Sequence, residues 1–260
     1  MEEITTKLIE IVVVGAYKNS ELLTLKALSW FTLLLIQNLS VSLMNTKPTD
    51  PHANKKSFAC TALFCSYLLG GLLYSSQVLH NICFVLSFCV TSILIVLRYS
   101  PPFVYNKKGP GWIFRFVLEG VCWITVHSLA LSDKPGIVIF EYMPVFLVYE
   151  AWYLTKELQE ASDDIKNKSI TTVMLMGKQG WKRIFLLIHL FCFVYLLVDG
   201  YLGMWKGLPL LLFPWTIFQL RCVNTMSCQT MQVQSFLYFL CFGVLTAGGV
   251  KLDNYVNGLA

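Results

Sequence analysis

The sequence predicts an all-α membrane protein, a multi-pass bundle of eight or nine transmembrane helices, and three observations lead to this prediction. Of the 260 residues, 56% are apolar and 13% are charged, whereas a soluble chain is usually about 45–50% apolar and about 25% charged. The mean hydropathy is +0.61. Apolar runs of roughly the 20 residues that cross a bilayer recur along the chain, without the alternating pattern of a barrel strand. Because backbone groups in lipid must be hydrogen-bonded within the fold, these runs favour helices.

The expected helices lie between charged residues or Pro and Gly breaks. In order, they span residues 22–44, 58–79, 82–97, 112–131, 136–154, 184–203, 207–221 and 234–250. Residues 8–16 form a shorter apolar run, which is the candidate for a ninth helix. No basic region precedes this run, so no signal peptide is predicted. Inside the run at 112–131, Arg115 and Glu119 are four residues apart, and we expect them to form a structural ion pair.

Lys and Arg residues gather in alternate loops. Lys134, Lys206 and Lys251 lie on one side of the expected membrane. Thirteen lie on the other side, which the positive-inside rule assigns to the cytosol. These thirteen are Lys47, Lys55, Lys56, Arg98, Lys107, Lys108, Lys156, Lys166, Lys168, Lys178, Lys182, Arg183 and Arg221. The net charge of +5 favours anionic lipid or a phosphorylated ligand, and no basic run is dense enough to indicate nucleic acid.

A stripe of polar residues continues from the run at 136–154. Glu150, Tyr153, Glu157, Glu160 and Asp164 are spaced 3, 4, 3 and 4 residues apart, which places all five on one face of a helix. Stacked carboxylates repel one another unless a cation lies between them. Mg²⁺ takes oxygen ligands and is commonly bound by one or two carboxylates together with substrate phosphates. The stripe therefore suits a magnesium diphosphate, and the alternative interpretation is a solvated extension of the helix.

The stripe belongs to a longer pattern that ends at Gly177. Its members are Tyr153, Lys156, Glu157, Glu160, Asp164, Thr171 and Gly177. Their order and offsets resemble a motif of the UbiA family of intramembrane prenyltransferases, in which Tyr, Lys-Asp and two further Asp residues precede a Thr-Leu-Pro-Val-like segment and a Gly. The chain departs from the motif by having Glu at the first two acidic positions. It also has Lys168 in place of a Gly, and Thr172-Val173-Met174 in place of Leu-Pro-Val.

A second loop also resembles this family. Arg98-Tyr99-Ser100-Pro101-Pro102, followed by Lys107 and Lys108 and then Gly109-Pro110-Gly111, is similar to the family's Tyr-Ser-x-Pro-Pro loop with its following Lys. Pro-rich loops with Lys are ordinary helix connections when they occur alone. Here the two patterns occur in the family's order and on the same expected side of the membrane.

The end of the first long helix departs from the family. UbiA enzymes carry an Asn and two Asp residues at four-residue intervals there, whereas this chain has Asn38, Ser42 and Asn45. Amides and hydroxyls carry no charge and bind Mg²⁺ more weakly than carboxylates do, so the first metal cluster is lost. Asp50 and His52 follow this helix, and the alternatives for them are metal binding and a solvated loop.

The resemblance implies one UbiA-like transmembrane domain over residues 1–260, with a first helix that is truncated relative to the family. Its cytosolic mouth would bind a polyprenyl diphosphate with Mg²⁺, and an opening to membrane lipid would admit a hydrophobic acceptor for the prenyl group. The implied metal ligands are Glu157, Glu160 and Asp164. Catalytic roles fall to Tyr153 and Lys156, and substrate binding falls to Asn38, Ser42, Lys107 and Lys156.

Three alternatives to prenyl transfer remain open at the level of sequence. A related terpene cyclase would ionise the same diphosphate and need no acceptor. A non-catalytic protein that binds an isoprenoid would explain the missing first acidic cluster. A transporter or receptor is disfavoured, because the polar groups gather at one membrane face and no pair of interrupted helices occurs in two related halves.

Overall fold

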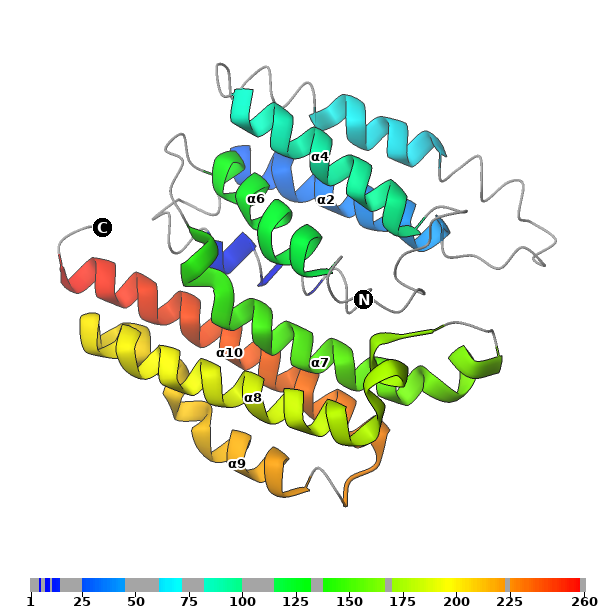
Figure 1. Ribbon diagram of the computed structural model, residues 1–260. Coiled ribbons are helices and arrows are strands. Elements are labelled where there is room, and N and C mark those ends of the chain that lie inside the picture. Colours follow the sequence, from blue (N-terminus) through cyan, green and yellow to red (C-terminus); the bar gives the residue numbers. More distant parts are fainter. Residues whose placement is uncertain are drawn as a thin grey trace.

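The computed structural model describes residues 5, 8–9, 11–14, 25–44, 61–71, 82–99, 115–131, 138–166, 170–222 and 225–257, and its regular elements there are helices (Figure 1). The elements are α2 (Leu25–Met44), α4 (Ile82–Tyr99), the π-helix η2 (Phe116–Trp123), α6 (Ile124–Leu131), α7 (Val138–Lys166), α8 (Thr172–Leu202), the 3₁₀-helix η3 (Met204–Leu212), α9 (Phe213–Cys222) and α10 (Cys228–Val256). Residues 61–71 are also helical. The predicted all-α bundle is therefore confirmed.

α7 lies at the centre of the bundle, packed against both α8 and α10 (Figure 1). Aromatic side chains fill the α7–α10 contact, where the ring centroid of Trp152 lies 5.0 Å from that of Phe236. A second group of helices contains α2, α4 and α6, and the buried Trp30 of α2 donates a hydrogen bond of 3.0 Å to His127 Nδ1 of α6. η2 contacts α4, α6 and α7, so it joins the two groups.

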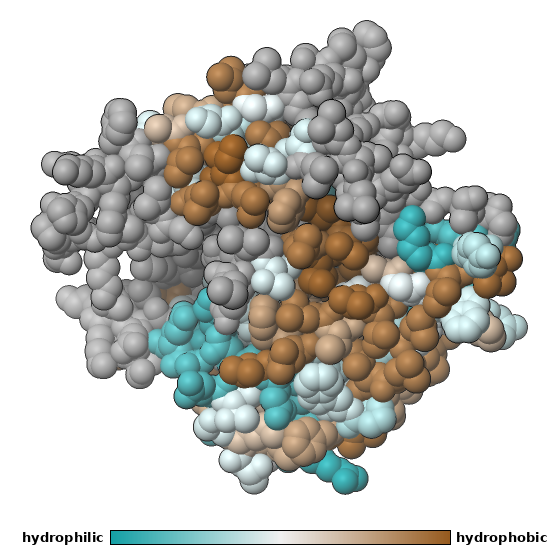
Figure 2. Space-filling view, turned by 180° about the vertical axis from the view of Figure 1, so that it is seen from behind, coloured by the Kyte–Doolittle hydropathy of each residue, from teal (hydrophilic) through white to brown (hydrophobic). Residues whose placement is uncertain are grey.

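The outer face of α8 is apolar and uncovered. Its exposed large residues recur with a helical period: Leu186, Leu187, Leu190, Phe191, Val194, Leu197, Val198 and Tyr201. A soluble monomer rarely exposes such a contiguous apolar surface. Figure 2, the view from behind, shows apolar residues gathered over part of that side of the molecule, beside hydrophilic patches. By length and composition, Thr172–Tyr201 and Cys228–Val256 can each cross a membrane. These features indicate that lipid surrounds the exposed apolar surface of α8.

The expected and observed helix ends differ where polar residues continue a helix. α7 extends to Lys166 rather than 154, and α8 begins at Thr172 rather than 184. The run at 207–221 divides at Phe213 into η3 and α9. Hydropathy marks the part of a helix that suits lipid, not the residues where hydrogen bonding begins and ends. At the N-terminus, residues 11–14 are helical, and the buried Ile9 lies so close to α10 that a Cβ at Gly243 would overlap it.

Candidate functional site

The polar stripe of α7 runs from the interior of the bundle to its surface. Glu150 and Glu157 are buried, Tyr153 is half-buried, and Glu160 is exposed. The 3–4 spacing of the stripe puts these side chains on one side of α7, as the sequence predicts. α7 includes Asp164, but the side chain of Asp164 lies outside the described residues. The two buried carboxylates need a cationic partner, because an isolated charge in this environment is very unfavourable.

Arg115 is that partner, and its guanidinium lies between the two buried carboxylates. Arg115 Nε donates to Glu150 Oε1 at 3.0 Å and to Oε2 at 3.3 Å, and Nη2 donates to Glu150 Oε2 at 3.2 Å. Nη1 donates to Glu157 Oε1 at 2.8 Å. The guanidinium carbon lies 4.0 Å from the centroid of the Tyr153 ring, a distance suited to cation–π attraction. Arg115 itself is completely buried, so this ion-pair network is inside the protein.

The turn between α7 and α8 completes the environment of Glu157. The backbone N–H of Val173 donates to Glu157 Oε2 at 3.4 Å. Thr171 caps α8 in an extended conformation, and its carbonyl accepts a hydrogen bond of 3.2 Å from the N–H of Leu175. Gly177 then interrupts α8 with φ of 67° and ψ of 171°. The family-like positions Thr171 and Gly177 therefore shape the segment that contacts Glu157.

We expect Gly177→Ala to lower the free energy of unfolding by about 1–3 kcal/mol, the cost of holding a side-chain-bearing residue in a left-handed conformation. Gly248→Ala is the matched control, because a Cβ would meet nothing within 4 Å at either glycine and only Gly177 has a positive φ. Denaturant unfolding of the purified protein in detergent compares the two variants. Equal stability of both variants would show that the kink tolerates any residue.

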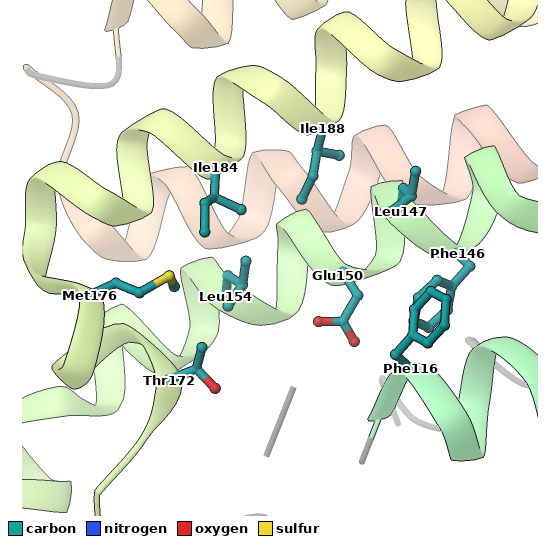
Figure 3. Close-up of a pocket in the computed structure, with 9 residues that line it drawn as sticks. All are labelled: Phe116, Phe146, Leu147, Glu150, Leu154, Thr172, Met176, Ile184 and Ile188. Atoms are coloured by element: carbon teal, nitrogen blue, oxygen red, sulfur yellow. The ribbon is translucent and has the colours of Figure 1, made fainter. Parts of the chain in front are cut away.

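An apolar cavity of about 330 Å³ lies between α7 and α8. Phe116, which follows Arg115 in the sequence, is one of its lining residues. Figure 3 shows Thr172 and Met176 at one end of its lining and Phe116 and Phe146 at the other. The lining residues are Phe116, Phe146, Leu147, Glu150, Leu154, Thr172, Met176, Ile184 and Ile188. The rings of Phe116 and Phe146 meet edge to face, with centroids 5.6 Å apart. The site is thus an apolar compartment with Glu150 among the residues of its wall.

The other predicted site residues are described in part. Lys156 is half-buried on α7, and its Nζ lies 5.7 Å from the ring centroid of Trp152. Asn38 and Ser42 are within α2, but their side chains lie outside the described residues. Lys107 lies outside them altogether, as do Asp50 and His52. The side chain of Glu119 is likewise not described, so the expected pair of Arg115 with Glu119 stays a prediction, and the ion pairs described for Arg115 are with α7.

The described residues fit a magnesium ion at Glu157 poorly. Both oxygens of Glu157 accept hydrogen bonds, one from Arg115 and one from Val173. Among the described residues, no group of three or more His, Cys, Asp or Glu side chains is placed to hold a metal. Glu160 is exposed near the end of the stripe, and it and Asp164 stay predicted metal ligands.

Comparison with known proteins supports the fold. No protein-family model and no curated protein matches the sequence. A solved structure of digeranylgeranylglyceryl phosphate synthase in membranes is similar over 96% of this chain and 93% of the synthase, with a TM-score of 0.65 and 14% identity. That synthase is a UbiA-family intramembrane prenyltransferase. The chain has the UbiA fold. At this identity the likeness concerns the fold, and it confirms the architecture that the two loop motifs implied.

Within the UbiA fold, the Arg115 network and the Phe116–Phe146 contact join segments that are far apart in the sequence. No spacing between residues in the sequence indicates either contact.

Proposed function

We propose that the chain is an intramembrane prenyltransferase that moves a prenyl group from a polyprenyl diphosphate to a hydrophobic acceptor. The observation that carries the proposal is an apolar cavity in a UbiA fold, with a buried ionic network at its wall. An apolar compartment suits an isoprenoid chain, and charged groups beside it suit a diphosphate. The proposal includes several membrane crossings, with the loops that follow α4 and α7 on the cytosolic side.

The residues of the chain would position and shield the reacting groups. The prenyl tail would lie along Leu154, Ile184 and Ile188, with its far end against the edge-to-face ring pair. Cleavage of the allylic C–O bond leaves the electron pair on the diphosphate and a carbocation on the prenyl group. Tyr153 would stabilise that cation through the ring face that Arg115 does not cover, and the acceptor would capture it and lose a proton. Exclusion of water from the apolar cavity would prevent hydrolysis.

Glu160 and Asp164 would hold Mg²⁺, and Lys156 and Lys107 would bind the diphosphate. Bound there, the metal would neutralise charge on the leaving diphosphate. Glu157, the third residue in the family-like set, could join these ligands only by giving up its contact with Arg115. Catalysis would then depend mainly on positioning and electrostatic stabilisation.

The direct test is release of pyrophosphate by the purified protein from a panel of prenyl diphosphates. The reaction is measured with and without Mg²⁺ and with and without aromatic and lipid-like acceptors. Release that requires both Mg²⁺ and an acceptor is the expected result. Release without any acceptor, together with a cyclised product, would identify a cyclase, and binding of prenyl diphosphates without release would identify a non-catalytic isoprenoid-binding protein.

Blocking the cavity should reduce activity according to the length of the prenyl chain. Ile184→Trp places a larger side chain in the cavity, and overpacking of this kind costs about 1–3 kcal/mol. We therefore expect kcat/KM to fall about 5- to 150-fold, with the greatest loss for the longest prenyl diphosphate. Leu187→Trp is the control, because Leu187 is exposed on the outer face of the same helix. A loss that is equal for both variants and all chain lengths would mean that the tail lies elsewhere.

A further inference from the structure

We infer that Arg115 supplies a fixed positive charge in place of one metal ion and that it binds an oxygen of the diphosphate directly. This inference rests on the proposed prenyl diphosphate substrate and assigns Arg115 a binding role within that site. Four features of the chain carry it: the loss of one acidic cluster, the charge of the network, the unused donors of Arg115, and its place behind the cavity wall.

The first feature is a lack of carboxylates in the sequence at the end of the first long apolar run. Asn38, Ser42 and Asn45 occupy the stripe where a metal-binding cluster would need carboxylates, and neutral oxygens hold Mg²⁺ weakly. A diphosphate carries several negative charges, which one divalent ion neutralises incompletely. A site with one acidic cluster therefore leaves more of that charge for cationic side chains of the protein to neutralise, and Arg115 would add to Lys156 and Lys107.

The second feature is the balance of charge around Arg115. Its single positive charge faces the two carboxylates of Glu150 and Glu157 at 2.8–3.3 Å. Such charge-assisted hydrogen bonds are about twice as strong as neutral ones, so they hold the guanidinium in place. The Tyr153 ring, 4.0 Å from the guanidinium carbon, covers one face of it. Arg115 therefore occupies the place of the cation that the acidic stripe requires.

The third feature is the number of donors that the network leaves over. A guanidinium has five N–H donors in a fixed plane. Nε, Nη1 and Nη2 each direct one N–H at Glu150 or Glu157. The second N–H of Nη1 and that of Nη2 have no acceptor among the described residues. Two N–H groups of the guanidinium are thus left for an anionic oxygen, and Arg binds phosphate through such charge-assisted hydrogen bonds.

The fourth feature is the place of Arg115 relative to the cavity. Glu150 lines the cavity and is bonded to Arg115 on its other side, so the guanidinium is one side chain away from the compartment. Because Arg115 is already buried, its desolvation is complete before any ligand binds. A diphosphate oxygen that accepts from the remaining N–H groups leaves the contacts of Arg115 with Glu150 and Glu157 in place, so neither carboxylate loses its partner.

The test is binding of a non-hydrolysable prenyl thiodiphosphate to the purified full-length protein in detergent, with EDTA or with Mg²⁺. We expect the wild type to bind in EDTA and to lose about 10- to 100-fold in affinity in Arg115→Met. Arg115→Lys should recover part of this loss, because Lys keeps the charge but not the fork. Arg115→Met alone leaves two buried carboxylates unpaired and can unfold the protein. The triple variant Arg115→Met, Glu150→Gln, Glu157→Gln removes the buried charges together, so its binding measures the role of Arg115 in a folded protein.

Two results would overturn the inference. The first is binding of the triple variant in EDTA within about twofold of the wild type. The second is binding of the wild type that requires Mg²⁺, which would leave the proposed prenyl transfer intact. Failure of the wild type to bind the probe with or without Mg²⁺, together with no pyrophosphate release, would instead reject the proposed function and the inference with it. Because the probe does not react, the two failures are distinguishable.

Discussion

Arg115→Met is expected to lower the free energy of unfolding by about 3–5 kcal/mol, the usual cost of removing one member of a buried ion-pair network. The substitution leaves Glu150 and Glu157 buried without the cation that bonds to both of them. Methionine roughly fills the space of the apolar part of the arginine side chain. The decrease in the free energy of unfolding would therefore come from the missing charge rather than from a cavity. Denaturant titration in detergent, followed by tryptophan fluorescence, measures the change.

Two controls separate this effect from a general sensitivity to substitution. Arg183→Met changes the same residue types at an exposed position of α8, and we expect it to alter the free energy of unfolding by less than about 0.5 kcal/mol. Adding Glu150→Gln and Glu157→Gln to Arg115→Met should restore most of the loss, because neutral amides in an interior cost far less than unpaired carboxylates. An Arg115→Met variant as stable as Arg183→Met would mean that the network does not support the fold.

The helices were predictable from the sequence wherever apolar runs define them. The expected spans at 22–44, 82–97 and 112–131 agree closely with α2, α4, and η2 together with α6. The start of α8 was missed, because residues 172–183 carry Gly177, Gly180 and three basic side chains among them. Those residues are helical through local hydrogen bonds, which composition does not report. Prediction from hydropathy therefore succeeds for the lipid-facing parts and fails at polar helix ends.

The candidate site was predictable only along one helix at a time. The spacing of Glu150, Tyr153 and Glu157 correctly indicates a shared face of α7. The partner of these acids was not predictable, since Arg115 lies 35 residues from Glu150 and 42 from Glu157. The four-residue spacing from Arg115 to Glu119 predicts a pair within one helix, which stays untested, whereas contacts between helices leave no spacing in the sequence. The acidic stripe predicts a nearby cation, and the cation at its buried end is Arg115.

The stripe on α7 therefore divides into two parts with different chemistry. Glu150 and Glu157 are buried and are neutralised in part by a cation of the protein. Glu160 and Asp164 lie further along the helix, and Glu160 is exposed to solvent. A metal ion that binds and leaves with the diphosphate is better suited to the exposed part of the stripe. In the buried part an incoming ion would lose its solvation, so a guanidinium that belongs to the protein is better suited there. This division predicts which carboxylates control turnover.

Asp164→Ala is expected to lower kcat for pyrophosphate release by roughly 10²–10³-fold, comparable to removing one group that stabilises charge in a transition state. Glu160→Ala should have an effect of the same order. If both carboxylates hold one Mg²⁺, the double variant should lose little more than either single variant, because residues that act as a unit are not additive. Raising the Mg²⁺ concentration should restore part of the activity in either single variant, since one remaining carboxylate still binds the metal weakly.

Gln159→Ala is the matched control for both carboxylate variants. Gln159 is exposed, immediately precedes Glu160 on α7, and lies outside the 3–4 spacing of the stripe. We expect its kcat and its dependence on Mg²⁺ to stay within about twofold of the wild type, because a surface substitution away from the site changes little. Additive losses for Glu160 and Asp164 that do not respond to Mg²⁺ would place the two carboxylates in separate roles. Activity unchanged in both variants would remove the metal from this end of α7 and leave Arg115 and the lysines as the charges that face the diphosphate.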